Sequence, residues 1–195
     1  WQHTTSPQKA PDKPGKVTIG FTQGVPTSLD GRATKMRTLI EKLNVLGAKH
    51  GVGRMDMVEN RLVGIKSREL YEAPGAVQIL WAHKELEALC LDREVAHFKP
   101  ILQEKFSELV YYGLWYSPLR EAISAFIAET QKKVTGAITI ELYKGSIRTL
   151  SRESKYSLYD KSLATYDTGD AFDHTAAEGF IKIFGLPSKV LARRK

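Results

Sequence analysis

The stretch AITIELYKGSIRTLSR, residues 137–152, decides the fold class because it encodes a complete β-hairpin. Apolar side chains alternate with polar ones along its first half, at Ile138, Ile140 and Leu142, which is the period of a half-buried strand. A Lys-Gly pair then supplies a turn, and the second half alternates again, less cleanly. Two strands joined by a tight turn run antiparallel, so the sequence predicts an antiparallel sheet.

Strand signals also occur near the N-terminus, where Val17, Ile19 and Phe21 alternate and Asp30-Gly31 offers a second turn. Elsewhere apolar residues recur every three or four positions, which predicts helices. The predicted helices cover residues 35–49, 74–91, 92–110, 117–133 and 176–182. Helices outnumber strands and the strands are joined by turns, so the predicted fold class is α+β, an antiparallel sheet with several long amphipathic helices and a C-terminal helix.

Polar residues, glycine and proline set the predicted helix ends. Asp92 and Ser117 are expected to cap the N-termini of two long helices. Pro100 is expected to kink or to start the first of these helices. Asp173 is expected to cap the last short helix, which the Gly-Leu-Pro sequence at 185–187 should end, leaving a basic tail.

The chain of 195 residues carries a formal net charge of +7, which raises the question of a nucleic-acid partner. The excess is spread along the chain: residues 1–50 sum to +5 (8 basic, 3 acidic), 51–100 to −1 (7 and 8), 101–150 to +1 (6 and 5) and 151–195 to +2 (8 and 6). A basic stripe that could follow phosphates is not evident. The charge therefore favours a diffuse, solvated surface.

The sequence offers little for metal, disulfide or covalent chemistry. Cys90 is the single cysteine, so the chain has no disulfide framework. A single cysteine fits a reducing, cytoplasmic compartment. We expect Cys90 to lie in the core. The histidines lack metal-ligand spacing and are expected to be ordinary surface or boundary residues. We find no serine nucleophile elbow and no phosphate-binding loop. No apolar run approaches the roughly 20 residues that span a bilayer.

One stretch concentrates both charge and glycine: HGVGRMDMVENRLVGIKSRELY, residues 50–71. A surface loop does not need its glycines, and a buried segment could not leave so many charges unpaired. We interpret the stretch as the wall of a polar pocket or as a salt-bridged turn. Spacing alone leaves open whether its charged residues bind a ligand or only pair with one another on the surface.

Several short motifs resemble those of one enzyme family. They are KHGVGRMDMVENRLVGIKSRELYEAPG, LDREV, KFSELVYYGLWYSP, LYKGSI, SRESKYSLY and AEGFI. Their order and separations, between about residues 6 and 190, resemble the C-terminal half of argininosuccinate synthase. The resemblance implies an ATP-dependent carbon–nitrogen ligase of arginine biosynthesis and the urea cycle. Such enzymes join citrulline to aspartate through a citrullyl-adenylate and release argininosuccinate, AMP and pyrophosphate.

The resemblance also implies which residues bind substrate. Glu59 and Tyr71 match the family's citrulline contacts, and no catalytic or metal-binding residue is carried over. ATP and Mg²⁺ are implied for the complete enzyme, bound by an N-terminal domain whose Ser-Gly-Gly-Leu-Asp-Thr-Ser loop has no counterpart here. This chain alone is therefore expected to be inactive. Glu69 and Ala76 stand where the family pattern has glycine, and Ala73 where it has threonine, so the backbone before Tyr71 lacks an expected glycine.

The expected organisation is an extended entry segment at 1–16, a synthetase and multimerisation domain at 17–171, and an oligomerisation helix with its tail at 172–195. The start at Trp1, without methionine, is typical of a processed or truncated piece. The resemblance implies a homo-oligomer, a tetramer, with neither nucleic acid nor membrane as partner. The segment 172–190 is expected to reach a neighbouring copy, because its apolar residues are too many for an exposed chain end.

Two other functions stay open. A noncatalytic oligomerisation module would keep the helices and the C-terminal segment but would not need Glu59 and Tyr71, so citrulline binding distinguishes it. A nucleic-acid-binding domain would show salt-dependent affinity for any duplex, which the scattered charge argues against.

Overall fold

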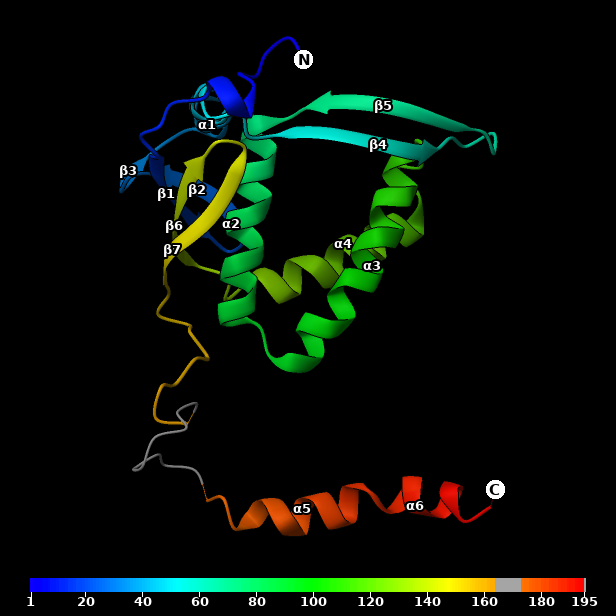
Figure 1. Ribbon diagram of the computed structural model, residues 1–195. Coiled ribbons are helices and arrows are strands. Elements are labelled where there is room, and N and C mark those ends of the chain that lie inside the picture. Colours follow the sequence, from blue (N-terminus) through cyan, green and yellow to red (C-terminus); the bar gives the residue numbers. More distant parts are fainter. Residues whose placement is uncertain (164–172, 195) are drawn as a thin grey trace. The chain divides into compact units, whose positions relative to one another are not determined.

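The structure, a computed structural model, describes residues 1–163 and 173–194 and divides into two units, Trp1–Leu158 and Tyr159–Lys195. The first unit holds a five-stranded sheet, a separate two-stranded hairpin and four α-helices, and the described residues of the second unit hold two short helices (Figure 1). The expected boundary between residues 171 and 172 lies outside the described residues.

The elements are named in chain order. The strands are β1 (Gly15–Thr22), β2 (Val25–Leu29), β3 (Arg32–Ala33), β4 (Arg54–Asn60), β5 (Lys66–Glu72), β6 (Gly136–Tyr143) and β7 (Ser146–Glu153). The helices are the 3-10 turn η1 (Pro7–Lys9), α1 (Met36–Lys49), α2 (Pro74–Cys90), α3 (Arg93–Tyr111), α4 (Pro118–Gln131), α5 (Ala176–Phe184) and α6 (Leu186–Ala192).

The main sheet has the order β3-β2-β1-β6-β7, and each neighbouring pair is antiparallel. The predicted α+β class is confirmed, and so is the hairpin at 137–152. Its turn places Lys144 and Gly145 at φ values of 44° and 88°, in the left-handed region that a tight hairpin requires. β1 lies between β2 and β6, so the N-terminal strands and the late hairpin form one layer.

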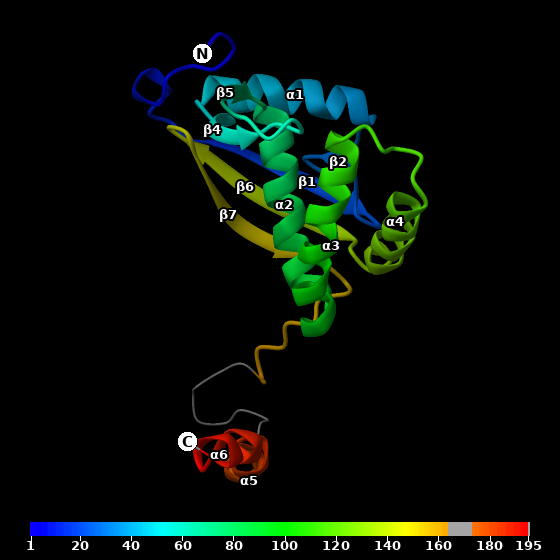
Figure 2. The ribbon, with the colours of Figure 1, turned by 90° about the vertical axis from the view of Figure 1, so that its right-hand side faces the viewer.

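Helix α2 crosses one face of the sheet, and α1 packs against α2 (Figure 2). The apolar residues that alternate along the strands meet the apolar stripes of these helices. The main members of this core are Val17, Ile19, Phe21, Leu39, Leu43, Ala82, Leu86, Ile138, Ile140 and Leu142. Cys90 lies in the same core, as predicted.

Helices α3 and α4 begin where the sequence predicts. The Asp92 side chain accepts hydrogen bonds from the backbone N–H groups of Glu94 and Val95, and Ser117 Oγ accepts one from Arg120 N. These bonds satisfy donors that the first turn of a helix leaves without partners. Pro100 lies inside α3, so it does not start that helix.

A buried polar cluster joins α2, α3 and α4. Lys99 Nζ lies 3.0 Å from Glu87 Oε1, and their side chains are only 7% and 15% exposed. Gln131 Nε2 donates to the same Glu87 oxygen at 2.7 Å, while its Oε1 lies 2.9 Å from His83 Nε2. Lys99 also donates to Gln103 Oε1 at 3.1 Å. The buried charges are therefore paired, as burial of a charge requires.

The stretch 50–71 forms a β-hairpin, an element that its residue pattern did not predict. β4 and β5 pair only with each other and project beyond the main sheet as a two-stranded hairpin (Figure 1). Gly64, at φ 84°, lies in the turn at its tip. Most of its side chains are exposed on both faces, so it lacks the alternation of apolar and polar residues that identifies a half-buried strand.

The second unit contains the predicted C-terminal helix and one more. Asp173 was expected to cap α5, but the cap position is Thr175. Asp173 instead accepts hydrogen bonds from the backbone and hydroxyl of Thr175 in the preceding turn. The Gly-Leu-Pro sequence ends α5 as predicted. A further helix, α6, then begins at Leu186 because Pro187 suits a first helical turn.

Candidate functional site

The glycines of the stretch 50–71 make the root of the hairpin. Gly51 and Gly53 have φ values of 72° and 94°, which other residues rarely adopt. A Cβ on Gly53 would lie 2.4 Å from Pro74 Cα, and Ala73 N donates to Gly53 O at 2.9 Å. The glycines therefore let the chain turn out of α1 and bring the start of β4 against the start of α2.

One face of the hairpin, which we call the site face, carries the polar residues of interest. Glu59 is in register with Ser67, Met57 with Glu69, and Met55 with Tyr71. Because side chains alternate between the two faces of a strand, these residues share one face. Sequence positions twelve apart are thus brought to the same surface.

The two predicted citrulline contacts meet on the site face. Tyr71 Oη donates a hydrogen bond to Glu59 Oε2 at 2.9 Å. This bond, followed by desolvation of the hydroxyl and the negative charge of Glu59, raises the pKa of Tyr71. Among the residues that the structure describes, Glu59 Oε1 has no hydrogen-bond partner. The arrangement can hold a carboxylate in place while one of its oxygens receives a cationic or N–H group.

The basic residues of the stretch are engaged elsewhere, so they do not neutralise Glu59 by direct pairing. Arg61 contacts Glu69 at 2.6 Å, and the Arg61 guanidinium holds the pKa of that carboxyl below its ordinary value. Arg68 pairs with Asp56 at 2.6 Å on the opposite face. The stretch is therefore salt-bridged, as one interpretation predicted. Glu59 takes no part in these ion pairs and is hydrogen-bonded to Tyr71 instead.

The three departures from the family pattern fall at ordinary positions. Glu69 lies in the middle of β5, opposite Met57, so no turn there requires glycine. Ala73 is the residue before α2, and no side-chain cap is formed at that position. Ala76 lies in the first turn of α2, where a helical backbone accommodates alanine better than glycine.

Sequence reasoning missed Glu72, the residue after Tyr71. Its carboxylate accepts hydrogen bonds from the backbone N–H groups of Gln2, His3 and Thr4 and from the Thr4 hydroxyl. These bonds, the hydroxyl first, lower the pKa of Glu72 to about 2. No local pattern could reveal contacts that span about 70 residues of chain.

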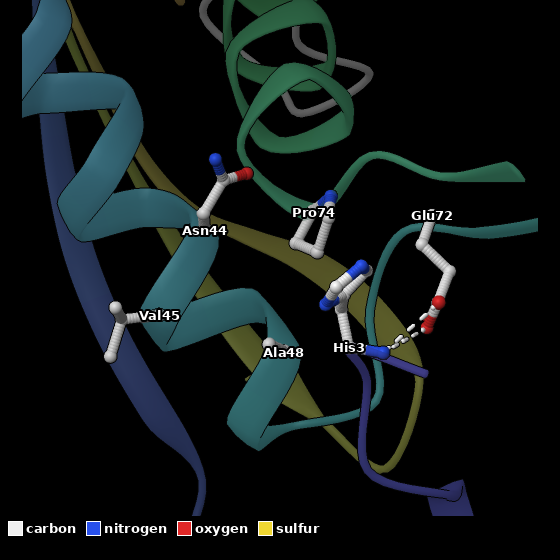
Figure 3. Close-up of a pocket in the computed structure, with 6 residues that line it drawn as sticks. All are labelled: His3, Asn44, Val45, Ala48, Glu72 and Pro74. Carbon is white, nitrogen blue, oxygen red and sulfur yellow. Dashed lines mark hydrogen bonds between the residues drawn. The ribbon is translucent and has the colours of Figure 1, made fainter. Parts of the chain in front are cut away.

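A cavity of about 350 Å³ lies beside Glu72 (Figure 3). It is lined by His3, Asn44, Val45, Ala48, Glu72 and Pro74. The cavity lies between the entry segment, α1 and the start of α2, at the root of the hairpin.

Metal sites, membrane spans and the histidines are considered next. No group of three or more His, Cys, Asp or Glu side chains in residues 1–163 and 173–194 could hold a metal ion. No described helix is long and apolar enough to cross a bilayer. The histidines were expected to be surface or boundary residues, and His50, at the C-terminal end of α1, is buried rather than on the surface. Burial at the end of α1, and then the charge of Lys49, lower its pKa.

With the fold and the exposed polar hairpin described, sequence comparison gives the family. The family model described as "Arginosuccinate synthase C-terminal domain" matches residues 1–191. The chain belongs to this family.

Similar proteins named argininosuccinate synthase occur in several bacteria. The protein of Geobacillus kaustophilus is 57% identical over 190 residues, covering 97% of this chain and 47% of the relative. That of Streptococcus mutans is 58% identical over 187 residues, covering 96% and 47%. That of Symbiobacterium thermophilum is 56% identical over 192 residues, covering 98% and 48%. The chain thus spans about half the length of these curated relatives.

Proposed function

We propose that this chain is the citrulline-holding part of an argininosuccinate synthase. The complete enzyme would ligate citrulline and aspartate with ATP, through a citrullyl-adenylate, to give argininosuccinate, AMP and pyrophosphate. Membership of the family supports this proposal. The observation that carries it is the contact between Tyr71 and Glu59 on the site face.

The chemistry of citrulline fits this pair. Citrulline carries an ammonium group, a carboxylate and a neutral ureido end, so its site needs a fixed acceptor for the ammonium. A carboxylate supplies a charge-assisted hydrogen bond. Glu59 is the acceptor in this proposal, and Tyr71 holds it by the 2.9 Å bond to Oε2. The other oxygen, Oε1, is directed to the substrate.

Activation of citrulline demands alignment more than a protein nucleophile. In the complete enzyme the ureido oxygen would attack the α-phosphorus of ATP and displace pyrophosphate, and orientation contributes much of the rate of such a step. The described residues present no metal-ligand cluster, and the sequence shows no phosphate-binding loop. We therefore assign none of the described residues to ATP or Mg²⁺, and we propose that the other half of the complete enzyme binds both.

We also propose that the protein assembles into a homo-oligomer, a tetramer, through residues 172–190. Apolar side chains of α5 and α6 are exposed within their own unit: Phe180, Ile181, Ile183, Phe184, Leu186, Val190 and Leu191. Phe180 and Phe184 stack at 5.2 Å between ring centroids and extend this surface. So much exposed apolar area suits an interface between copies.

The same exposed surface favours one rival function, a noncatalytic oligomerisation module. Deleting residues 172–195 and measuring mass by light scattering tests assembly: the proposal expects a smaller species. Assembly without citrulline binding would favour the rival.

The test of the proposed function is calorimetric titration of citrulline into a full-length protein that carries this domain. Glu59→Gln should weaken citrulline binding, whereas Glu104→Gln, an exposed glutamate on α3, serves as the matched control and should bind like wild type. Equal citrulline affinity in all three proteins would reject the proposed site.

A further inference from the structure

The entry segment is tied to the last residue of the hairpin. The Glu72 carboxylate accepts hydrogen bonds from the backbone N–H groups of Gln2 at 2.7 Å, His3 at 3.0 Å and Thr4 at 2.8 Å. The Thr4 hydroxyl donates to the same carboxylate. Three consecutive backbone N–H groups donate to the one carboxylate. This requires a specific backbone conformation at residues 2–4, because all three N–H groups must point toward Glu72 at the same time.

The neighbouring strand also contacts the entry segment. Arg54, the register partner of Glu72, donates from Nε to Thr4 Oγ1 and from Nη2 to Thr4 O, both at 2.7 Å. Its guanidinium also lies 4.9 Å from the centroid of the Trp1 ring, a distance at which a cation and an aromatic face attract. Thr4 is buried between the two strands' side chains.

These contacts of Glu72 and Arg54 with residues 1–4 lie one residue from the candidate site. Tyr71 precedes Glu72 in β5, and neighbouring residues of a strand point to opposite faces. Fixing Glu72 therefore fixes the backbone at Tyr71 and the direction in which its ring leaves the strand. Thr5 N extends the attachment by donating to Ala48 O at 2.9 Å, at the end of α1.

We propose that Glu72 is a positioning residue, which ties residues 1–4 to the hairpin root and so sets where Tyr71 and Glu59 meet citrulline. The inference rests on the proposed citrulline site. Glu72 contacts the entry segment on the opposite face, so it acts through the strand and not on substrate.

The test uses Glu72→Gln in a full-length protein that carries this domain. Glutamine has nearly the same shape but lacks the negative charge to which three N–H groups and a hydroxyl donate hydrogen bonds. We expect the KM for citrulline to rise by roughly tenfold, because small misplacement of a binding group is costly. The KM for ATP should stay unchanged. Glu72→Asp keeps the charge and should recover part of the citrulline affinity, and Glu104→Gln should match wild type.

A second variant covers the case in which Glu72→Gln does not fold. Thr4→Val keeps the shape of Thr4 and removes the hydroxyl that contacts both Glu72 and Arg54, and it should raise the citrulline KM by roughly threefold. A lower melting temperature with an unchanged citrulline KM in the variants that fold would overturn the inference.

Glu59→Gln, assayed in parallel, separates this inference from the proposed function. If Glu59→Gln raises the citrulline KM and neither Glu72→Gln nor Thr4→Val does, only the positioning role fails. If Glu59→Gln leaves the KM unchanged, the proposed citrulline site fails, and the positioning role fails with it.

Discussion

Two polar clusters of this domain each hold a glutamate but differ in surroundings. The buried cluster places Lys99 against Glu87 between three helices, with both side chains almost fully covered. The site face of the hairpin places Glu59 against Tyr71 where the tyrosine is 40% exposed. Burial makes an unpaired charge expensive, whereas exposure makes pairing optional. We therefore expect the first cluster to stabilise the fold and the second to serve binding.

The largest expected effect is on the buried cluster. Lys99→Met keeps most of the length of the side chain but leaves Glu87 without its cation, which should cost about 3 kcal/mol of the free energy of unfolding. The melting temperature should fall by about 6 to 12 °C. Thermal denaturation followed by circular dichroism measures this, and citrulline KM should be unchanged below the transition. An unchanged melting temperature would show that the cluster is not stabilising.

A smaller effect is expected on the site face. Tyr71→Phe removes one hydroxyl from Glu59 and leaves the ring in place, so citrulline affinity should fall by roughly twofold to tenfold. Steady-state kinetics with citrulline varied at saturating ATP and aspartate measures the change. A loss of melting temperature without a change in citrulline KM would assign the hydroxyl to stability instead.

The pH dependence of stability gives a third comparison. Burial lowers the pKa of His50 in the folded protein below its ordinary value of 6.5. The unfolded chain therefore binds the proton more readily, and the stability that neutral His50 allows is present above pH 6.5 and is lost as pH falls below it. His50→Gln should reduce this loss between pH 7 and pH 5.5 in urea denaturation. A pH profile that the substitution does not alter would contradict the assignment.

The smallest effect is expected for the exposed pair of Asp56 and Arg68, on the other face of the hairpin. Asp56→Asn should move the melting temperature by less than about 2 °C, because surface ion pairs contribute little. It should also leave the citrulline KM unchanged. A large rise in that KM would show that the hairpin responds as a whole, and that the two faces cannot be assigned separate roles.

The sequence predicted the part of the fold that has a buried face. Ile138, Ile140 and Leu142 line the core as their alternation indicates, and Asp92 and Ser117 cap their helices. Such signals are local, since each depends on residues within one strand or one turn.

The residue pattern did not predict the hairpin β4–β5, because these strands have no buried face and therefore no alternation of apolar and polar residues. Glu59 and Tyr71 could be named only through resemblance to a family, and their contact follows from a strand register that spacing does not reveal. The grip of Glu72 on residues 2–4 and the burial of His50 depend on segments that meet only in the folded chain. Local sequence patterns carry no information on such meetings.

The most direct measurement is the pair of citrulline KM and melting temperature for Glu59→Gln in a full-length protein. Loss of one charge-assisted hydrogen bond costs about 1.5 to 3 kcal/mol, so the account predicts a roughly tenfold to hundredfold rise in citrulline KM with a nearly unchanged melting temperature. A lowered melting temperature with an unchanged citrulline KM would contradict it, and would place Glu59 with Lys99 and Glu87 among the residues that only stabilise the fold.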